Sequence, residues 1–212
     1  GHFHNDNPLA VLRDVPGVIL ACPSNGADAA KMLRESVRLA REEQRIVVFL
    51  EPIALYATQD LHDVGDGGWM QTYPDASERI ALGDVGIHGD GKDLAIISYA
   101  NGCYLSLQAQ KKLADKGINA RVIDLRWLTP LPKEKMLEAI GSCKHVLIVD
   151  ETRRSGGVSE SIMTCLAENI QVPFERLASE DSFIPTGPAY ASTMPSQDSI
   201  INAALKLIGE DK

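Results

Sequence analysis

The chain has 212 residues, a hydrophobic fraction of 44% and a formal net charge of −8. This length can hold one large domain or one and a half smaller ones, and the apolar content is sufficient for a buried core. The acidic balance argues against nucleic acid and anionic membranes as partners, and the sequence has no apolar run long enough to span a bilayer.

The four cysteines lie within apolar segments and show no CxxC spacing; they are Cys22, Cys103, Cys143 and Cys165. This pattern predicts reduced core residues, not a disulfide framework or a zinc site. Because free thiols are typical of reducing compartments, we expect a cytoplasmic protein.

The chain begins with Gly1-His2-Phe3-His4, which contains two of its five histidines. A domain normally begins with a dispensable terminus, whereas these histidines precede a segment with the pattern of packed α/β structure. We therefore expect the chain to be the C-terminal part of a larger protein and to share its chemistry with the remainder. An alternative for Gly1-His2 alone is the remnant of an expression tag, which does not extend to His4.

The first regular elements predict a βαβ unit. Residues 18–22 are apolar and indicate a buried strand, after which Ser24 or Asn25 can cap a helix. That helix has apolar residues at spacings of three and four: Ala30, Leu33, Val37 and Ala40. Residues 46–50 indicate a second buried strand, which should run parallel to the first.

Residues 57–92 are rich in glycine and turn-forming residues, including Gly65-Asp66-Gly67-Gly68 and Gly89-Asp90-Gly91. We interpret this segment as a linker that ends in an extended piece near residues 80–82. Its length indicates a crossing between domains. His62 and His88 lie in it and are expected to be solvated.

From residue 93 onward, strands and helices alternate regularly. The expected strands are 94–99, 121–125, 146–149 and 174–178, and the expected helices are 102–116, 132–140, 157–168 and a last one capped by Ser196. This order predicts a complete open α/β sheet. His145 is expected to be structural, and nothing in this part has the pattern of a catalytic motif.

Two stretches of the N-terminal part resemble one family. His4-Asn5-Asp6-Asn7, followed by Val15-Pro16-Gly17-Val18 and Cys22-Pro23-Ser24, resembles the "HSQ … PGL … PS" segment of the β subunits of thiamine-diphosphate-dependent 2-oxo acid dehydrogenases. Phe49-Leu50-Glu51-Pro52-Ile53-Ala54-Leu55-Tyr56 resembles the "LEP…LY" that closes the pyrimidine-binding domain of those proteins.

A third stretch resembles the C-terminal domain that this family shares with transketolase; it comprises residues 121–126, 129–132 and 149–151. Together the motifs cover nearly the whole chain in the family's order. The resemblance implies an α/β fold with three parts: the C-terminal part of a pyrimidine-binding domain (1–56), a linker (57–92) and a transketolase C-terminal-type open, mostly parallel sheet (93–212).

The resemblance also implies a site that is shared between polypeptides. Thiamine diphosphate and Mg²⁺ would be held mainly by an α-type subunit or by the upstream half of the same polypeptide, and the family's activating glutamate lies upstream of this chain. His4 matches the family's active-site histidine, which lies close to the reacting carbonyl. An imidazole suits proton transfer there because its pKa is near neutrality. His4 is the one catalytic residue assigned, and no cofactor-binding or metal-binding residue is assigned.

Some positions depart from the family pattern or have two interpretations. Asn5-Asp6 replaces the family's "SQ", which leaves the 2-oxo acid open. Gly89-Asp90-Gly91 with Asn119 imitates the family's magnesium-diphosphate motif, but Gly91 leads into a strand, so a turn is predicted. Residues 155–159, at a helix start, could bind an anion or form a capped turn. The resemblance does not allow the potassium site of some family members to be assigned to residues 41–45 of this chain.

Three functions follow as hypotheses. The first is the decarboxylating β-type component of a 2-oxo acid dehydrogenase, inactive as this chain alone, which passes an acyl group to lipoyl. Its partners would be the α-type subunit or upstream half, further copies through both domains, and a lipoyl acyltransferase core. The second is a transketolase-like or deoxyxylulose-phosphate-synthase-like transferase. The third is a non-catalytic module for dimerisation and docking.

Overall fold

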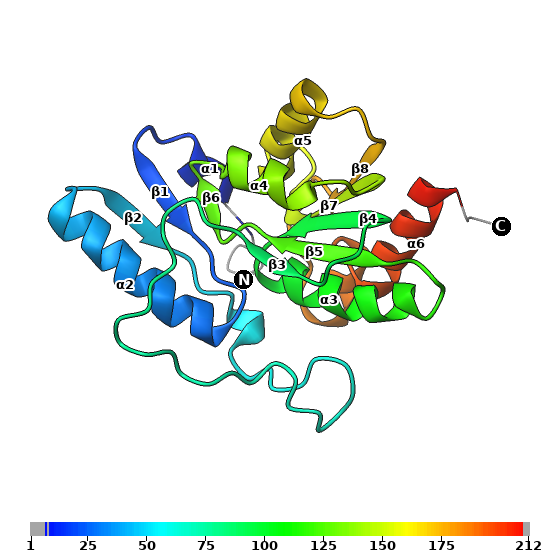
Figure 1. The fold of residues 1–212 in the computed structure, drawn as a ribbon, viewed down its shortest axis with the longest axis horizontal. Helices are drawn as coiled ribbons and strands as arrows, with labels where there is room; N and C mark the ends of the chain where they lie inside the picture. Colours follow the sequence, from blue (N-terminus) through cyan, green and yellow to red (C-terminus); the bar gives the residue numbers. More distant parts are fainter. Residues whose placement is uncertain (1–6, 8, 210–212) are drawn as a thin grey trace.

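The computed structural model describes residues 7 and 9–209, which form two β-sheets (Figure 1). The first sheet has the strand order β2-β1-β6. β1 (Val18–Ala21) and β2 (Ile46–Phe49) are parallel and are joined by α2 (Gly26–Glu42), which confirms the predicted βαβ unit. A short helix, α1 (Leu9–Arg13), precedes β1.

Asn25 begins α2 as the sequence predicts. Its side-chain oxygen accepts a hydrogen bond of 2.9 Å from the backbone N–H of Asp28. This bond satisfies one of the N–H groups that a helix leaves unpaired in its first turn. The start of α2 is therefore fixed next to the carboxyl ends of β1 and β2.

The second sheet has the order β3-β5-β4-β7-β8. β4 (Leu94–Ser98), β5 (Ala120–Asp124), β7 (His145–Arg153) and β8 (Phe174–Ser179) are parallel to one another. The helices between and after them are α3 (Ala100–Ala114), α4 (Lys133–Ile140), α5 (Val158–Asn169) and α6 (Gln197–Ile208). This architecture confirms the predicted open, mostly parallel α/β sheet.

Helices cover both faces of the second sheet (Figure 1). α3 and α6 pack on one face through residues such as Leu107 and Ile200, and α4 and α5 pack on the other through residues such as Met136 and Leu166. Parallel strands are continuously apolar because both of their faces are buried, and β4 is buried along its whole length. The alternation of strands and helices that the sequence predicts after residue 93 is therefore confirmed.

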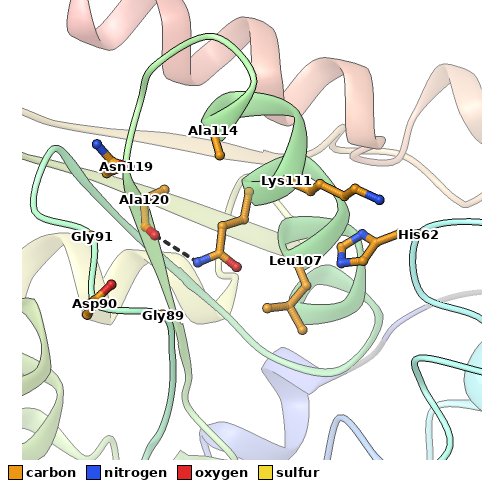
Figure 2. A pocket seen from close by; sticks show the side chains of 10 residues that line it. His62, Gly89, Asp90, Gly91, Leu107, Lys111, Ala114, Asn119 and Ala120 are labelled. Carbon is orange, nitrogen blue, oxygen red and sulfur yellow. Dashed lines mark hydrogen bonds between the residues drawn. The ribbon is translucent and has the colours of Figure 1, made fainter.

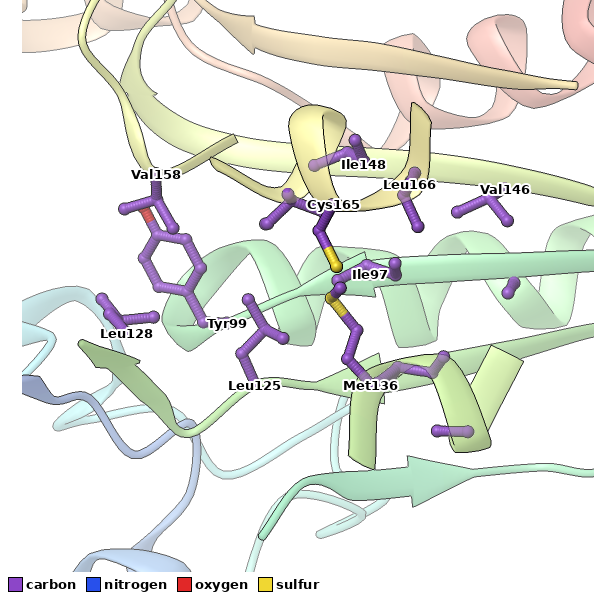
Figure 3. Packing of buried hydrophobic residues seen from close by; sticks show 14 of the residues in the cluster. Ile97, Tyr99, Leu125, Leu128, Met136, Val146, Ile148, Val158, Cys165 and Leu166 are labelled. Atoms are coloured by element: carbon purple, nitrogen blue, oxygen red, sulfur yellow. The ribbon is translucent and has the colours of Figure 1, made fainter. Parts of the chain in front are cut away.

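The two sheets share one hydrophobic cluster. Leu20 of β1 and Cys22 lie in the same cluster as Ile97 of β4 and Ile148 of β7. Figure 3 shows Tyr99 in this cluster beside Leu128 and Val158. Because the apolar surface is continuous, the carboxyl ends of strands from both sheets face one another.

Two strands were not expected. β6 (Trp127–Thr129) follows β5 but leaves the second sheet and pairs antiparallel with β1. β3 (Gly86–His88) lies within the predicted linker and pairs antiparallel with β5. The extended piece of the linker is thus at residues 86–88 and not at 80–82. Ile80 is instead a buried side chain in the same hydrophobic cluster as Trp127 and residues of α2. The expected solvation of His88 is wrong, since burial of its ring, followed by the charge of Arg126, lowers its pKa.

Two short 3₁₀ helices complete the structure, at Ile53–Leu55 and Gly187–Ser192. The division into 1–56, 57–92 and 93–212 stays a prediction. Among the described residues, no helix is long and apolar enough to cross a membrane.

Candidate functional site

A cavity of about 190 Å³ lies between the two sheets. Its walls come from residues at the carboxyl ends of four strands: Cys22 after β1, Glu51 after β2, Tyr99 after β4 and Glu151 in the last part of β7. Open α/β sheets bind ligands outside the carboxyl ends of their strands. We therefore take this cavity, which we call the inter-sheet cavity, as the candidate functional site.

The N-terminal segment also reaches the inter-sheet cavity. Asn7 and Leu9 line it. His4, the one residue assigned to catalysis from the sequence, lies outside the described residues. Its assignment stays a prediction, and it precedes Asn7 by three positions along the chain.

A buried carboxylate organises the wall of the cavity. Asp150 is fully buried, and its Oδ1 atom accepts hydrogen bonds from the Tyr99 hydroxyl at 2.6 Å and from the Thr152 N–H at 2.8 Å. The Thr152 hydroxyl also donates to Oδ1, and the Ser159 N–H donates to Oδ2 at 2.7 Å. A buried charge is tolerated only when it is paired or hydrogen-bonded in this way. Asp150 thereby ties β4, β7 and the start of α5 together.

This network decides between the two interpretations of residues 155–159. The N–H of Ser159 at the start of α5 is already bonded to Asp150, and the N–H of Val158 is bonded to the Thr152 hydroxyl at 3.0 Å. The chain's own side chains thus occupy these donors of the helix start. Residues 155–159 therefore form a capped turn, which was one of the two interpretations that the sequence left open.

Glu151 is the group in the cavity whose pKa is shifted toward neutrality. Burial raises its pKa to about 7, partly opposed by a hydrogen bond of 2.6 Å that the Asn101 side-chain amide donates to its carboxylate. A carboxyl with a pKa near neutrality can donate or accept a proton under physiological conditions. Glu51 lies on the opposite side of the same cavity.

Ala100 provides a second sign of function at this position. Its φ angle is 50°, in the left-handed region that residues with a β-carbon rarely adopt. Strained backbone of this kind is concentrated at functional sites. Its two neighbours in sequence, Tyr99 and Asn101, both donate hydrogen bonds to acidic residues of β7.

The pH dependence of stability should reveal the buried state of Glu151. The folded-state pKa of Glu151 lies above the ordinary value of 4.5. The stability that its protonated form contributes to the folded state is therefore complete below pH 4.5 and is lost as pH rises to about 7. We expect Glu151→Gln to stabilise the protein at pH 8 by about 1–2 kcal/mol relative to its effect at pH 4.5. Urea unfolding of both proteins at the two pH values measures this difference, and equal effects at both would contradict it.

The cysteines are core residues as predicted. Cys22, Cys103, Cys143 and Cys165 are all buried and free. Burial raises the pKa of the Cys22 thiol, with the Asp124 and Glu151 charges adding to the effect. A thiol held in its protonated form is a poor nucleophile, so Cys22 serves as apolar wall of the cavity.

A larger cavity, of about 660 Å³, lies on the other side of Glu51-Pro52, between α2 and the linker. Glu51 and Pro52 line both cavities, and the larger one is otherwise lined by apolar and uncharged polar side chains such as Leu33, Tyr56 and Tyr73. Among the described residues that line these two cavities, none is Lys, Arg or His. A diphosphate would therefore meet carboxylates and no cation, so these residues do not fit that end of thiamine diphosphate.

A third cavity, of about 260 Å³, lies between α3 and the turn that joins β3 to β4 (Figure 2). Gln110 lines it and donates to the Ala120 carbonyl at 2.8 Å, while His62 and Lys111 lie on the side away from Asp90. Gly89 has a positive φ of 79°, and residues 89–93 connect β3 to β4. His62 is exposed, as expected.

Sequence reasoning missed Glu151, Asn101 and Tyr99 as site residues. The available signal was the pair Asp150-Glu151 at the end of an otherwise apolar run, since acidic residues at the carboxyl end of a buried strand need a reason to be there. His145 lies at the start of β7, with its Nδ1 atom 3.2 Å from the Asp93 carbonyl, in the structural setting expected of it.

Comparison with known proteins identifies relatives over most of the chain. Residues 83–200 match the model of the family "Transketolase, C-terminal domain". The pyruvate dehydrogenase E1 component subunit beta of Bacillus subtilis (strain 168) is 25% identical over 210 residues, which cover 97% of this chain and 60% of that protein. The 1-deoxy-D-xylulose-5-phosphate synthase of Halothermothrix orenii is 30% identical over 207 residues, 95% of this chain and 30% of that protein.

A solved structure supports the same fold. A chain described as a split-gene transketolase in an inactive β4 tetramer superposes with a TM-score of 0.74 at 20% identity, covering 96% of this chain and 61% of the other. The chain thus spans only part of the length of the relatives that it matches.

Proposed function

Because the chain belongs to the transketolase C-terminal domain family, we propose that it is the β-type part of a thiamine-diphosphate-dependent 2-oxo acid dehydrogenase. The reaction would be oxidative decarboxylation of a 2-oxo acid, with transfer of the acyl group to lipoyl. The single observation that carries this choice is the similarity to pyruvate dehydrogenase E1 β subunits over nearly the whole chain.

The charges of the site support a position for this chain at the reacting end of the active centre. Glu51 and Glu151 face the inter-sheet cavity, and the described lining residues offer no cation to a diphosphate. The diphosphate and Mg²⁺ would be held by an α-type subunit or the upstream half of the same polypeptide. When bound, the cofactor would supply the carbon nucleophile that attacks the 2-oxo group.

The residues of this chain would hold and move protons beside the substrate. His4 is the proposed proton donor or acceptor at the reacting carbonyl, since a neutral imidazole can serve either role. Glu151, with a pKa of about 7, would be present in both its protonated and its ionised form at the inter-sheet cavity near neutral pH. A protonated Glu151 would spare an anionic substrate the repulsion of a second fixed carboxylate.

A sugar-phosphate transferase is the second candidate. The similarity to 1-deoxy-D-xylulose-5-phosphate synthase, at 30% identity, favours it. Against it, the described residues of the two cavities beside Glu51 include no cation for a substrate phosphate.

The third candidate is a non-catalytic role for the chain alone. The inactive β4 tetramer described for the split-gene transketolase supports the idea that such a chain self-associates without activity. Several apolar side chains of the first part are exposed, such as Val11, Ile46 and Ile53, and these would be covered by further subunits or by a lipoyl acyltransferase core.

A panel of substrates distinguishes the three candidate functions. The complete enzyme, assembled with its α-type subunit or upstream half, is supplied with thiamine diphosphate and Mg²⁺ and then with pyruvate, branched 2-oxo acids or ketose phosphates. We expect release of CO₂ and acylation of a lipoyl domain with a 2-oxo acid, and none with the chain alone. Turnover of ketose phosphates would favour the second candidate, and no turnover of any substrate would favour the third.

A further inference from the structure

Three potential metal ligands, none of which lines the inter-sheet cavity, meet on one face of the second sheet. The His88 imidazole, the Cys103 sulfur and an Asp124 carboxylate oxygen each offer an atom, and these atoms all lie within 4.8 Å of one another. They come from β3, α3 and the end of β5. No two of them are neighbours in sequence, so the fold alone brings them together.

The strand register explains this convergence. β3 and β5 are antiparallel, with His88 opposite Val122 and Gly86 opposite Asp124. Paired residues project to the same face of a sheet, and so do residues two apart along a strand. His88 and Asp124 therefore project toward the face that α3 covers, where Cys103 packs in the same cluster as Val122.

Two of the three residues each have one buried side-chain atom without a hydrogen-bond partner among the described residues. These atoms are His88 Nε2 and Asp124 Oδ2. Asp124 is fully buried, and its other oxygen accepts only a long bond of 3.2 Å from the backbone N–H of Arg126. An unsatisfied buried polar atom costs about 1–3 kcal/mol, and more when it is charged. Such atoms need a partner that the protein itself does not supply.

A fourth atom is available at the same place. The Ser24 hydroxyl is also buried and makes no hydrogen bond of good geometry, but it lies near Cys103 and Asp124 and lowers the pKa of both by its proximity. Ser24 is 1% exposed. A hydroxyl or a water molecule at this position would complete a four-coordinate arrangement.

The surrounding charges are compatible with a bound dication. The nearest cation, Arg126, already forms an ion pair with Asp28, with its Nη2 atom 2.8 Å from the Asp28 carboxylate. A thiolate and a carboxylate together carry two negative charges. They would balance a divalent ion, and the Arg126–Asp28 pair would stay neutral beside it.

We propose that His88, Cys103 and Asp124 form a structural site for a zinc-like divalent cation, with Ser24 or water as the fourth ligand. A set of one nitrogen, one thiolate sulfur and one carboxylate oxygen is typical of Zn²⁺ and not of Mg²⁺, which prefers oxygen alone. The ion would join β3 to α3 and β5 and so anchor the end of the linker to the second sheet. This role is independent of the proposed enzymatic function.

Cobalt substitution tests the proposal directly. The purified protein is stripped with a chelator in the presence of a phosphine reductant and titrated with Co²⁺, and then with Zn²⁺ in competition. We expect one ion per chain, a near-ultraviolet charge-transfer band from a cobalt–thiolate bond, visible bands of tetrahedral cobalt, and a higher Tm with Zn²⁺. Absence of stoichiometric binding would overturn the proposal and leave a bridging water as the partner of these atoms.

Variants then identify the ligands. Cys103→Ser should abolish the thiolate band, and His88→Gln and Asp124→Asn should each weaken Co²⁺ binding by at least roughly tenfold. Cys22→Ser, Cys143→Ser, Cys165→Ser and His62→Ala are controls that should retain the site. Should Cys103→Ser fail to fold, the wild-type band together with its retention in the three control cysteine variants still supports a cobalt–thiolate site at Cys103. Loss of the band in a control cysteine variant, or its survival in Cys103→Ser, would place the sulfur elsewhere and contradict the assignment.

Discussion

Replacing His4 with alanine in the assembled enzyme is expected to lower lipoyl-dependent turnover by about 10²- to 10⁴-fold, which is the usual contribution of a general acid or base. The reason is chemical: a methyl group can neither donate nor accept the proton at the reacting carbonyl. The fall should appear mainly in kcat, because a group that acts in the transition state contributes less to substrate binding. Steady-state kinetics with the preferred 2-oxo acid measure it.

The matched control is His62→Ala, since His62 is an exposed histidine of the linker that does not line the inter-sheet cavity. Its turnover should equal that of the wild type. Far-ultraviolet circular dichroism and the assembled mass show whether the His4 variant still forms the complete particle. A correctly assembled His4→Ala enzyme with unchanged kcat would remove His4 from the active site.

Asp150→Ala is expected to lower the free energy of unfolding by about 3–5 kcal/mol, which is a large loss for a single substitution. The carboxylate accepts hydrogen bonds from Tyr99, Thr152 and Ser159, and it is fully buried. Truncation leaves those donors unpaired and opens a void between β7 and α5. Urea unfolding followed by fluorescence and circular dichroism gives the change in the free energy of unfolding.

Two further variants separate this effect from general sensitivity. Asp150→Asn keeps the shape and one acceptor oxygen, so it should lose less stability than Asp150→Ala. Glu168→Ala, an exposed acidic residue of α5, should change stability by less than about 0.5 kcal/mol. A loss below about 1 kcal/mol for Asp150→Ala would show that the network does not hold the strand ends together.

The parts of the fold that were predictable from the sequence are those with a local physical cause. Residues 94–97 of β4 and residues 146–149 of β7 are continuous apolar runs, and Asn25 and Ser196 cap the starts of α2 and α6 with their side chains. Each of these features is encoded within a few residues. The C-terminal sheet could therefore be predicted almost element by element.

The parts that were not predictable depend on contacts between distant segments. β6 is three residues long, and its partner β1 lies more than a hundred positions away. β3 is a strand only because it pairs with the edge of β5. Strands as short as these carry little pattern of their own, and tertiary pairing decides their conformation.

The same reasoning applies to the sites. His4 could be proposed from a motif in consecutive residues, whereas Glu151 becomes notable only when the strand ends of two sheets enclose it. Cys103 was correctly predicted to be buried, but its position beside His88 and Asp124 follows from strand register and helix packing. Composition and spacing cannot reveal a cluster whose members are far apart in sequence.

The central claim is that this chain supplies one side of a cofactor site that a second polypeptide, or an upstream half, completes. Native mass spectrometry of the protein isolated from its own cells tests it most directly, since it reports polypeptides and bound cofactor in one particle. We expect a particle that contains this chain, an α-type subunit or upstream half, thiamine diphosphate and Mg²⁺. A bare assembly of this chain alone, without cofactor and without capacity to bind it, would show that no second polypeptide completes a site here.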